Sequence, residues 1–172
     1  MDKAIWDRCV AFHGHACPGL ALGARLCEFV RERLGLGFSA DEELVCIAET
    51  DACPVDAVQV LLGCTFGKGN LLCAPTGKSA YTFYSRASGT GVRVVALRRQ
   101  TSMTREERMH WVLEAPLDEL FTTTAPKLPL PEKARIFPTL TCAVCGESMA
   151  EPMARIQDGK VVCLHCLRPC GR

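Results

Sequence analysis

A chain of 172 residues with 48% apolar residues is long enough for one medium-sized domain and a small second unit. Its net charge of +1 gives no general attraction to nucleic acid or to an anionic membrane. No apolar run approaches the roughly 18 residues of a membrane span, and the N-terminus lacks the apolar stretch of a signal peptide, so we expect a cytoplasmic protein with no membrane partner.

The first 121 residues mix helical and strand-like patterns without the regular alternation that marks a parallel sheet. The patterns predict helices at residues 2–12, from Pro18 to about Leu34, from Pro54, and from Thr104 to about Glu114, with one more turn at 117–121. Apolar runs predict strands at residues 44–48, 80–86 and 92–97, the last two joined as a hairpin by residues 88–91. We therefore expect an α+β core domain, residues 1–121, of helices and antiparallel strands.

The composition changes after residue 121. Three threonines are followed by prolines at positions 126, 129, 131 and 138. Proline-rich segments of this kind act as semi-rigid spacers. We expect residues 122–138 to form a linker and residues 139–172 to form a separate unit.

Twelve cysteines are a high count, and in a reducing compartment they indicate metal ligands, reactive thiols or small core residues rather than disulfides. Four of them form two C-x2-C pairs, Cys142 with Cys145 and Cys163 with Cys166. This spacing predicts a structural four-cysteine zinc site in which protein fills every tetrahedral position. The alternative, reduced core cysteines, is disfavoured because so short a segment buries too little apolar area to fold without metal.

The order of elements in residues 139–172 favours one type of zinc finger. A hairpin is expected at residues 153–162, with Asp158 and Gly159 in its turn, and the second cysteine pair would begin a short helix. This order resembles a treble-clef finger, which would be structural or would bind a partner. Cys170 remains as an additional thiol without an assigned role.

A second set of candidate ligands lies at two helix starts in the core. Cys17 precedes Pro18 and Cys53 precedes Pro54, so each cysteine would begin a helix whose N-terminus favours a thiolate. In an extended segment, His15 and Cys17 face the same side. We predict that His15, Cys17 and Cys53 converge on a second zinc ion or a redox metal and leave a fourth position open.

Three more residues complete this candidate catalytic site: Asp56, Cys64 and Lys68. Asp56 follows Cys53 in the same helix, and the other two lie in the glycine-rich loop 63–70. Lys68 would hold an anionic substrate group, although the loop does not match a P-loop and a solvated turn lysine is the simpler interpretation. Two alternatives stay open: one cysteine is a nucleophile with a histidine as its base, or these residues only cap helices and pack in the core.

Three segments of the core follow one another in a recognisable order: FHGHACPGLALG at 12–23, ETDACPVDAVQ at 49–59 and GCTFGKGNL at 63–71. Together with the four-cysteine finger they resemble the formylmethanofuran dehydrogenase E-subunit family. One departure is Pro54, where glycine is expected after the cysteine. The resemblance implies an α+β core that forms a homodimer, with a cleft built from the three motifs.

The resemblance also implies a setting. In the parent enzyme, carbon dioxide is reduced and attached to methanofuran as a formyl group, and the molybdenum or tungsten pterin and the iron–sulfur clusters belong to other subunits. The implied partners are therefore subunits of such a pterin-dependent dehydrogenase, and the implied role is a metal-binding accessory to, or derivative of, this methanogenesis-related oxidoreductase. Its rivals are a zinc-finger adaptor for protein or nucleic acid on an inert core, and a stand-alone metal or thiol enzyme. Two metal ions per chain would favour the first hypothesis.

Overall fold

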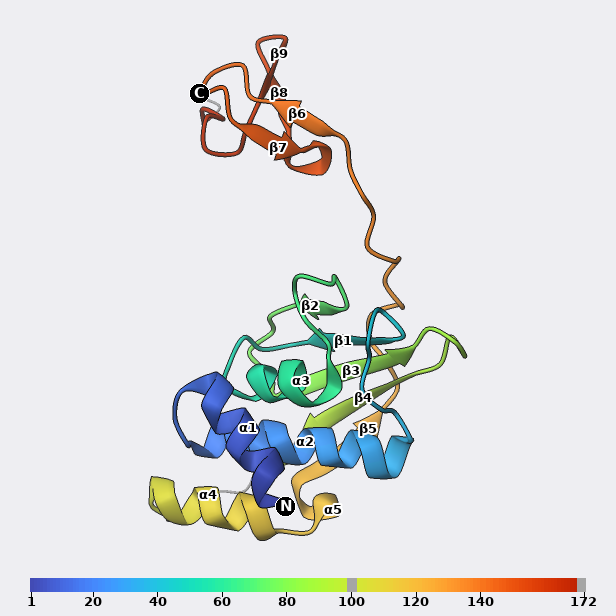
Figure 1. The fold of residues 1–172 in the computed structure, drawn as a ribbon, viewed down its shortest axis with the longest axis vertical. Coiled ribbons are helices and arrows are strands. Elements are labelled where there is room, and N and C mark those ends of the chain that lie inside the picture. The colour runs from blue at the N-terminus through green and yellow to red at the C-terminus, as the bar shows by residue number, and fades with distance from the viewer. Residues whose placement is uncertain (99–101, 170–172) are drawn as a thin grey trace. The chain divides into compact units, whose positions relative to one another are not determined.

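The chain divides into two compact units, Met1–Ala134 and Arg135–Arg172, here called the core domain and the finger. The computed structural model describes residues 1–98 and 102–169 (Figure 1). The core domain combines a sheet with helices, and the finger is small and carries a cysteine cluster, so the predicted fold class is confirmed. No helix in the described part of the chain is long and apolar enough to cross a membrane.

One five-stranded sheet forms the centre of the core domain, in the order β2-β1-β3-β4-β5. The strands are β1 Leu44–Ala48, β2 Leu71–Cys73, β3 Ala80–Ser85, β4 Gly91–Ala96 and β5 Phe121–Thr124. β1 and β2 are parallel, and the other neighbours are antiparallel. Every residue of β1 is buried because both faces of the sheet are covered, which explains its unbroken apolar sequence.

Helices cover one face of this sheet (Figure 1). They are α1 Lys3–His13, α2 Pro18–Leu34, α3 Pro54–Leu62, α4 Arg105–Glu114 and α5 Leu117–Leu120. Prolines occupy the first positions of α2 and α3, and Thr104 with Glu107 forms the expected capping box of α4. Local sequence signals therefore set these helix starts.

The close approach of α2 and α3 positions the N-termini of both helices. A methyl group on Gly23 would lie 2.5 Å from the Pro54 backbone, so only glycine permits this contact. A methyl group on Gly19 would lie 3.1 Å from the Cys53 side chain. The two glycines thus bring the cysteine at the start of each helix to the same place.

The opposite face of the sheet is covered by residues 125–134, which we call the strap. The Tyr84 hydroxyl donates to the carbonyl of Leu128 at 2.6 Å, and the Arg86 guanidinium donates to the carbonyl of Pro131 at 2.8 Å. Leu130 packs against the buried side chains of this face. The predicted linker at 122–138 therefore differs from the structure in its first part, because residues 121–124 pair as β5 and the strap belongs to the core domain.

The finger contains two short hairpins. β6 Thr139–Thr141 pairs with β7 Ser148–Ala150, the one-turn helix η1 Glu151–Met153 follows, and β8 Arg155–Gln157 pairs with β9 Lys160–Val162. Asp158 and Gly159 both have positive φ, at 51° and 73°, as a two-residue hairpin turn requires. Residues 164–166 form a turn, so the helix expected after the second cysteine pair is absent from the described residues.

A buried ion pair links two strands on the strap side of the sheet. Arg93 of β4 donates twice to Glu49, which follows β1, and the Nη2–Oε2 distance is 3.0 Å. The hydrogen bonds from Arg93 hold the pKa of the Glu49 carboxyl below its usual range. Because this pKa is lowered, the stabilisation is fully present above the usual carboxyl pKa and is lost as pH falls through the lowered value.

Replacing Arg93 with alanine should reduce the free energy of unfolding by about 3–5 kcal/mol, since it leaves the Glu49 carboxylate buried without its partner. Urea denaturation followed by the fluorescence of the two tryptophans, both in the core domain, measures the loss. The control is Arg33→Ala, which removes an exposed pair with Asp118 and should cost less than about 1 kcal/mol. Equal losses in the two variants would contradict the assignment.

Candidate metal centres

The finger brings its four cysteines together at one point. The sulfur atoms of Cys142, Cys145, Cys163 and Cys166 all lie within 4.8 Å of one another. The Cys145 and Cys163 sulfurs are 3.9 Å apart. Two ligands of a tetrahedral zinc ion with Zn–S bonds of about 2.3 Å lie about 3.8 Å apart, so the cluster fits zinc.

Backbone groups prepare one of these thiols for metal. The N–H groups of Cys145, Cys163 and Val144 lower the pKa of the Cys142 thiol to about 6. In contrast, Cys163 and Cys145 raise the pKa of the Cys166 thiol to about 12, because the neighbouring sulfurs compete for its proton. A divalent cation removes this conflict by stabilising all four thiolates.

Two residues near these ligands have different outcomes. His165 lies between two ligands in the sequence, and its side chain is exposed and outside the cluster. Cys170, the additional thiol of the sequence analysis, lies outside the described residues. The described cluster is therefore a closed four-sulfur site.

The second cluster lies in the core domain and consists of His13, Cys17 and Cys53. One nitrogen of His13 and the two sulfurs lie within 4.8 Å of one another. His13 is the last residue of α1, and the cysteines are the N-cap residues of α2 and α3. Three helix ends thus supply one ligand atom each.

Asp56 fixes the orientation of the His13 ring. The Nδ1 atom of His13 lies 2.6 Å from Oδ2 of Asp56, and its Nε2 atom lies 3.9 Å from the Cys17 sulfur. A carboxylate at Nδ1 favours the tautomer with its proton there, which leaves the Nε2 lone pair directed at the thiols. Gln59, one turn later in α3, donates to the other oxygen of Asp56 at 3.4 Å.

The two thiols have different surroundings. Cys17 is 2% exposed, and its sulfur accepts the backbone N–H of Leu20 at 3.3 Å, as expected for a cysteine at a helix start. Cys53 makes no such cap, and burial together with the Cys17 thiol raises its pKa. The expectation that a helix N-terminus lowers the thiol pKa is therefore wrong for Cys53, because desolvation is the larger effect there.

The donor set of this core cluster fits a borderline-soft divalent ion. With bond lengths of about 2.05 Å to nitrogen and 2.3 Å to sulfur, a tetrahedral ion separates these atoms by about 3.6 Å. The observed separation between His13 Nε2 and the Cys17 sulfur is 3.9 Å, within a small side-chain adjustment of this value. Among the described residues no fourth side chain joins the group, so its coordination would be incomplete without an outside ligand.

The histidine of the core cluster is His13, whereas the sequence predicted His15. The prediction assumed an extended segment, but Gly14 has a φ of 88° and the chain bends there. The bend leaves His15 exposed, with its ring centroid 4.5 Å from that of His13. His15 therefore lies beside the cluster without contributing to it.

Two other predicted site residues lie elsewhere. Cys64 is buried, its thiol donates to the carbonyl of Leu44 at 3.6 Å, and burial raises its pKa to about 12. The Lys68 ammonium donates to the carbonyls of Ser39 and Ala40, at 2.8 and 3.2 Å. Both residues fasten the glycine-rich loop to the preceding segment, and the structure does not bring them to the core cluster.

Sequence reasoning missed the role of His13, although one signal pointed to it. Cys53 and Asp56 are three residues apart at the start of one helix, which places them on the same face. A ligand paired with Asp56 must come from a neighbouring element, and α1 packs against α3. The histidine at the end of α1 was therefore the better candidate.

Comparisons with known proteins cover both units. Residues 12–122 match the family described as FmdE, molybdenum formylmethanofuran dehydrogenase operon. Residues 135–169 match the prokaryotic dksA/traR C4-type zinc finger. This second match, together with the geometry of the four cysteines, identifies the finger as a zinc-binding unit.

Two similar proteins extend these matches. A crystal structure of an FmdE-like protein of the tungsten formylmethanofuran dehydrogenase type, from Syntrophus aciditrophicus, has a TM-score of 0.73 and 27% sequence identity, over 95% of this chain and 90% of that one. A probable S-adenosyl-L-methionine-binding protein from Archaeoglobus fulgidus is 33% identical over 92% of this chain. The chain spans only 51% of the length of this second relative.

Replacing Cys145 with serine should release one zinc ion per chain and unfold the finger, because three sulfurs and a neutral hydroxyl hold zinc less well than four thiolates. Metal analysis and limited proteolysis measure the two effects. The core domain should keep its thermal transition, since it has its own buried core. A variant that retains its zinc and a protease-resistant finger would refute the assignment.

Proposed function

The chain belongs to the FmdE family, and from this premise we propose that its core domain binds a second metal ion, zinc or a redox metal, at His13, Cys17 and Cys53. We further propose that the protein is an accessory to, or a derivative of, a molybdenum- or tungsten-dependent one-carbon oxidoreductase. The observation that carries the metal proposal is the Asp56–His13 pair, which directs one ring nitrogen at two thiols. Carboxylates that orient a metal-binding histidine in this way are common around protein metal ions.

Each residue of the core cluster has a definite task in this proposal. Asp56 keeps the proton on Nδ1 of His13, and thus leaves Nε2 free to bind. The α2 N-terminus stabilises the Cys17 thiolate through the N–H of Leu20. Gly19 leaves room for the Cys53 sulfur, since a methyl group there would lie 3.5 Å from it.

A bound zinc ion would supply Lewis-acid chemistry at a position that protein does not fill. The chain itself would hold that position beside an exposed group, His15, whose ring lies against His13. An imidazole titrates near neutral pH, so His15 could accept or release a proton there. In this respect the core cluster differs from the finger, where four sulfurs leave no position for a substrate.

The proposed partners follow from the family alone. The name of the matched family refers to a molybdenum enzyme operon, and the similar Syntrophus protein carries a tungsten enzyme in its name. The sequence has no motif for a pterin or for an iron–sulfur cluster of its own, so redox cofactors would come from other subunits. Finding this chain in a complex with a pterin-dependent dehydrogenase would support the accessory role.

A cysteine enzyme is the second candidate, and one observation favours it. Cys17, His13 and Asp56 follow one another in the order of a thiol, base and orienting carboxylate, with separations of 3.9 and 2.6 Å. Such a triad does not need Cys53. Iodoacetamide separates the two candidates, because a catalytic thiolate would react quickly, whereas a thiolate bound to metal would be protected until the metal is chelated.

Metal analysis of the intact chain tests the proposed core centre. We expect two metal ions per chain in the unaltered protein and one in Cys53→Ser, which keeps the finger intact. Asp56→Asn should weaken binding of the core metal by about 10–100-fold, as found for other outer carboxylates. The matched control is Asp118→Asn, whose carboxylate faces solvent and Arg33, and it should change nothing. One metal ion per chain in the unaltered protein would overturn the proposal.

A homodimer, the assembly that the family resemblance implies, remains our expectation for this chain. Size-exclusion chromatography with light scattering on the full chain should give about twice the 18.7 kDa mass of one chain at micromolar concentration. A mass of one chain under the same conditions would contradict the expectation.

A further inference from the structure

A pocket of about 510 Å³ lies between the start of α2 and α4, and we call it the α2–α4 pocket. This volume falls within the range of small-molecule sites. Leu22, Trp111, Val112 and Leu120 form apolar parts of its wall. A ligand of this pocket would therefore have an apolar body.

The charge of the pocket selects the sign of its ligand. Its charged lining residues are Arg105 and Arg108, both exposed and three residues apart on α4. Neither guanidinium makes an ion pair or a hydrogen bond to another described residue, so both keep their donors for a ligand. Arginine binds carboxylate and phosphate oxygens through paired N–H groups.

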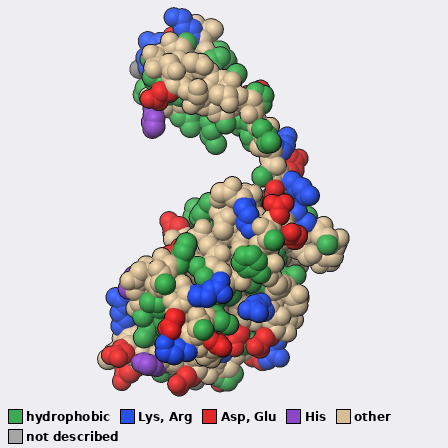
Figure 2. Space-filling model, in the orientation of Figure 1, with side chains coloured by type: hydrophobic (Ala, Val, Ile, Leu, Met, Phe, Trp, Pro, Cys, Tyr) green, Lys and Arg blue, Asp and Glu red, His purple; other side chains and the backbone are tan. Residues whose placement is uncertain are grey.

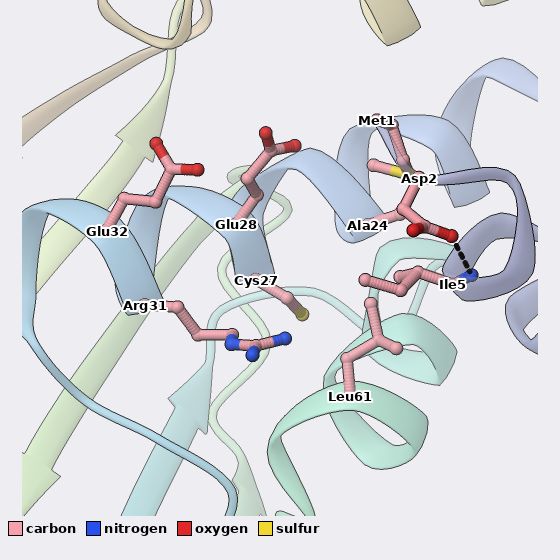
Figure 3. Close-up of a pocket in the computed structure, with 9 residues that line it drawn as sticks. All are labelled: Met1, Asp2, Ile5, Ala24, Cys27, Glu28, Arg31, Glu32 and Leu61. Carbon is pink, nitrogen blue, oxygen red and sulfur yellow. Dashed lines mark hydrogen bonds between the residues drawn. The ribbon is translucent and has the colours of Figure 1, made fainter.

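A second cavity provides a contrast (Figure 3). It measures about 450 Å³ and lies between α1, α2 and Leu61 of α3. Its lining includes one arginine, Arg31, but three carboxylates, those of Asp2, Glu28 and Glu32. Acidic and basic side chains are otherwise interspersed over the visible face of the core domain (Figure 2), so a pocket lined by cations alone is a local feature.

The α2–α4 pocket also adjoins the core cluster. Pro18 and Gly19, the first two residues of α2, line it directly after the ligand Cys17. The Cβ position of Gly19 lies 3.8 Å from the Cys17 sulfur and 3.5 Å from the Cys53 sulfur. One short segment of backbone therefore separates the pocket from the two thiols.

We propose that the α2–α4 pocket binds a small molecule that joins an anionic oxygen group to a flat apolar body. Arg105 and Arg108 hold the carboxylate or phosphate, and the apolar wall around Trp111 holds the body. Binding itself does not require a metal ion. Only the further step, that this molecule is a ligand or substrate of the core cluster, rests on the proposed function.

Two probes of equal shape and different charge test the proposal: 2-naphthoate and neutral 2-naphthamide. Nuclear magnetic resonance of the full chain should show saturable shifts of the Gly19 and Leu22 amides with naphthoate, and tighter binding of naphthoate than of naphthamide. Shifts confined to Cys27 and Arg31 would assign binding to the other cavity and overturn the proposal. Absence of saturable naphthoate binding up to about 10 mM would also overturn it.

The double variant Arg105→Gln/Arg108→Gln should weaken naphthoate binding by about tenfold or more and leave naphthamide binding unchanged. Arg31→Gln is the matched control and should leave both probes unaffected. A second measurement avoids substitution: raising the salt concentration should weaken naphthoate binding to the unaltered chain more than naphthamide binding. Equal effects of the double variant, or of salt, on the two probes would contradict the proposal.

Metal content distinguishes this proposal from that of the core centre. The double variant should keep the metal content of the unaltered chain, because neither arginine belongs to the core cluster. If the unaltered chain binds naphthoate at Gly19 but holds only one metal ion, the pocket stands and the core metal centre fails. If it holds two metal ions and binds no naphthoate, the reverse follows.

Discussion

The candidate core centre depends on one close contact, the approach of α2 to the first residues of α3. A methyl group at Gly23 would meet the backbone of Pro54 at 2.5 Å, and one at Gly19 would press on the Cys53 side chain. Because each helix begins with a Cys-Pro pair, this single contact places both thiols at the same point. The packing of α1 against α3 then adds His13 and its partner Asp56. Four residues from three segments meet because two glycines have no side chain.

The two cysteine clusters divide their tasks according to their ligands. In the finger, four sulfurs within one short segment close the coordination sphere, which suits a site that holds a small fold together. In the core domain, the fold is already held by a large buried cluster and by the Glu49–Arg93 pair, so its stability does not require a metal ion. An open set of three ligands is the arrangement expected where a protein uses metal for binding or chemistry.

Local signals in the sequence predicted much of this fold. The helix starts at Pro18, Pro54 and Thr104, the turn at Asp158–Gly159 and the paired finger cysteines depend on residues close together in the chain. Features that depend on tertiary contacts were not predictable in the same way. β5 and the strap looked like linker because threonines and prolines carry no apolar pattern, yet pairing with β4 and hydrogen bonds from Tyr84 and Arg86 order them. The choice of His13 over His15 depends on the bend at Gly14 and on the reach of Asp56 from another helix.

The central claim is that one chain holds two metal ions with different ligands, and X-ray absorption at the zinc edge tests it most directly. For the intact chain loaded with zinc, a four-sulfur finger and a core centre of two sulfurs, one nitrogen and one further light atom average to about three sulfurs and one nitrogen or oxygen per zinc. The account predicts this average, together with Zn–S distances of about 2.3 Å. An average of four sulfurs per zinc, with a single ion in each chain, would mean that the core centre binds no metal and would contradict the account.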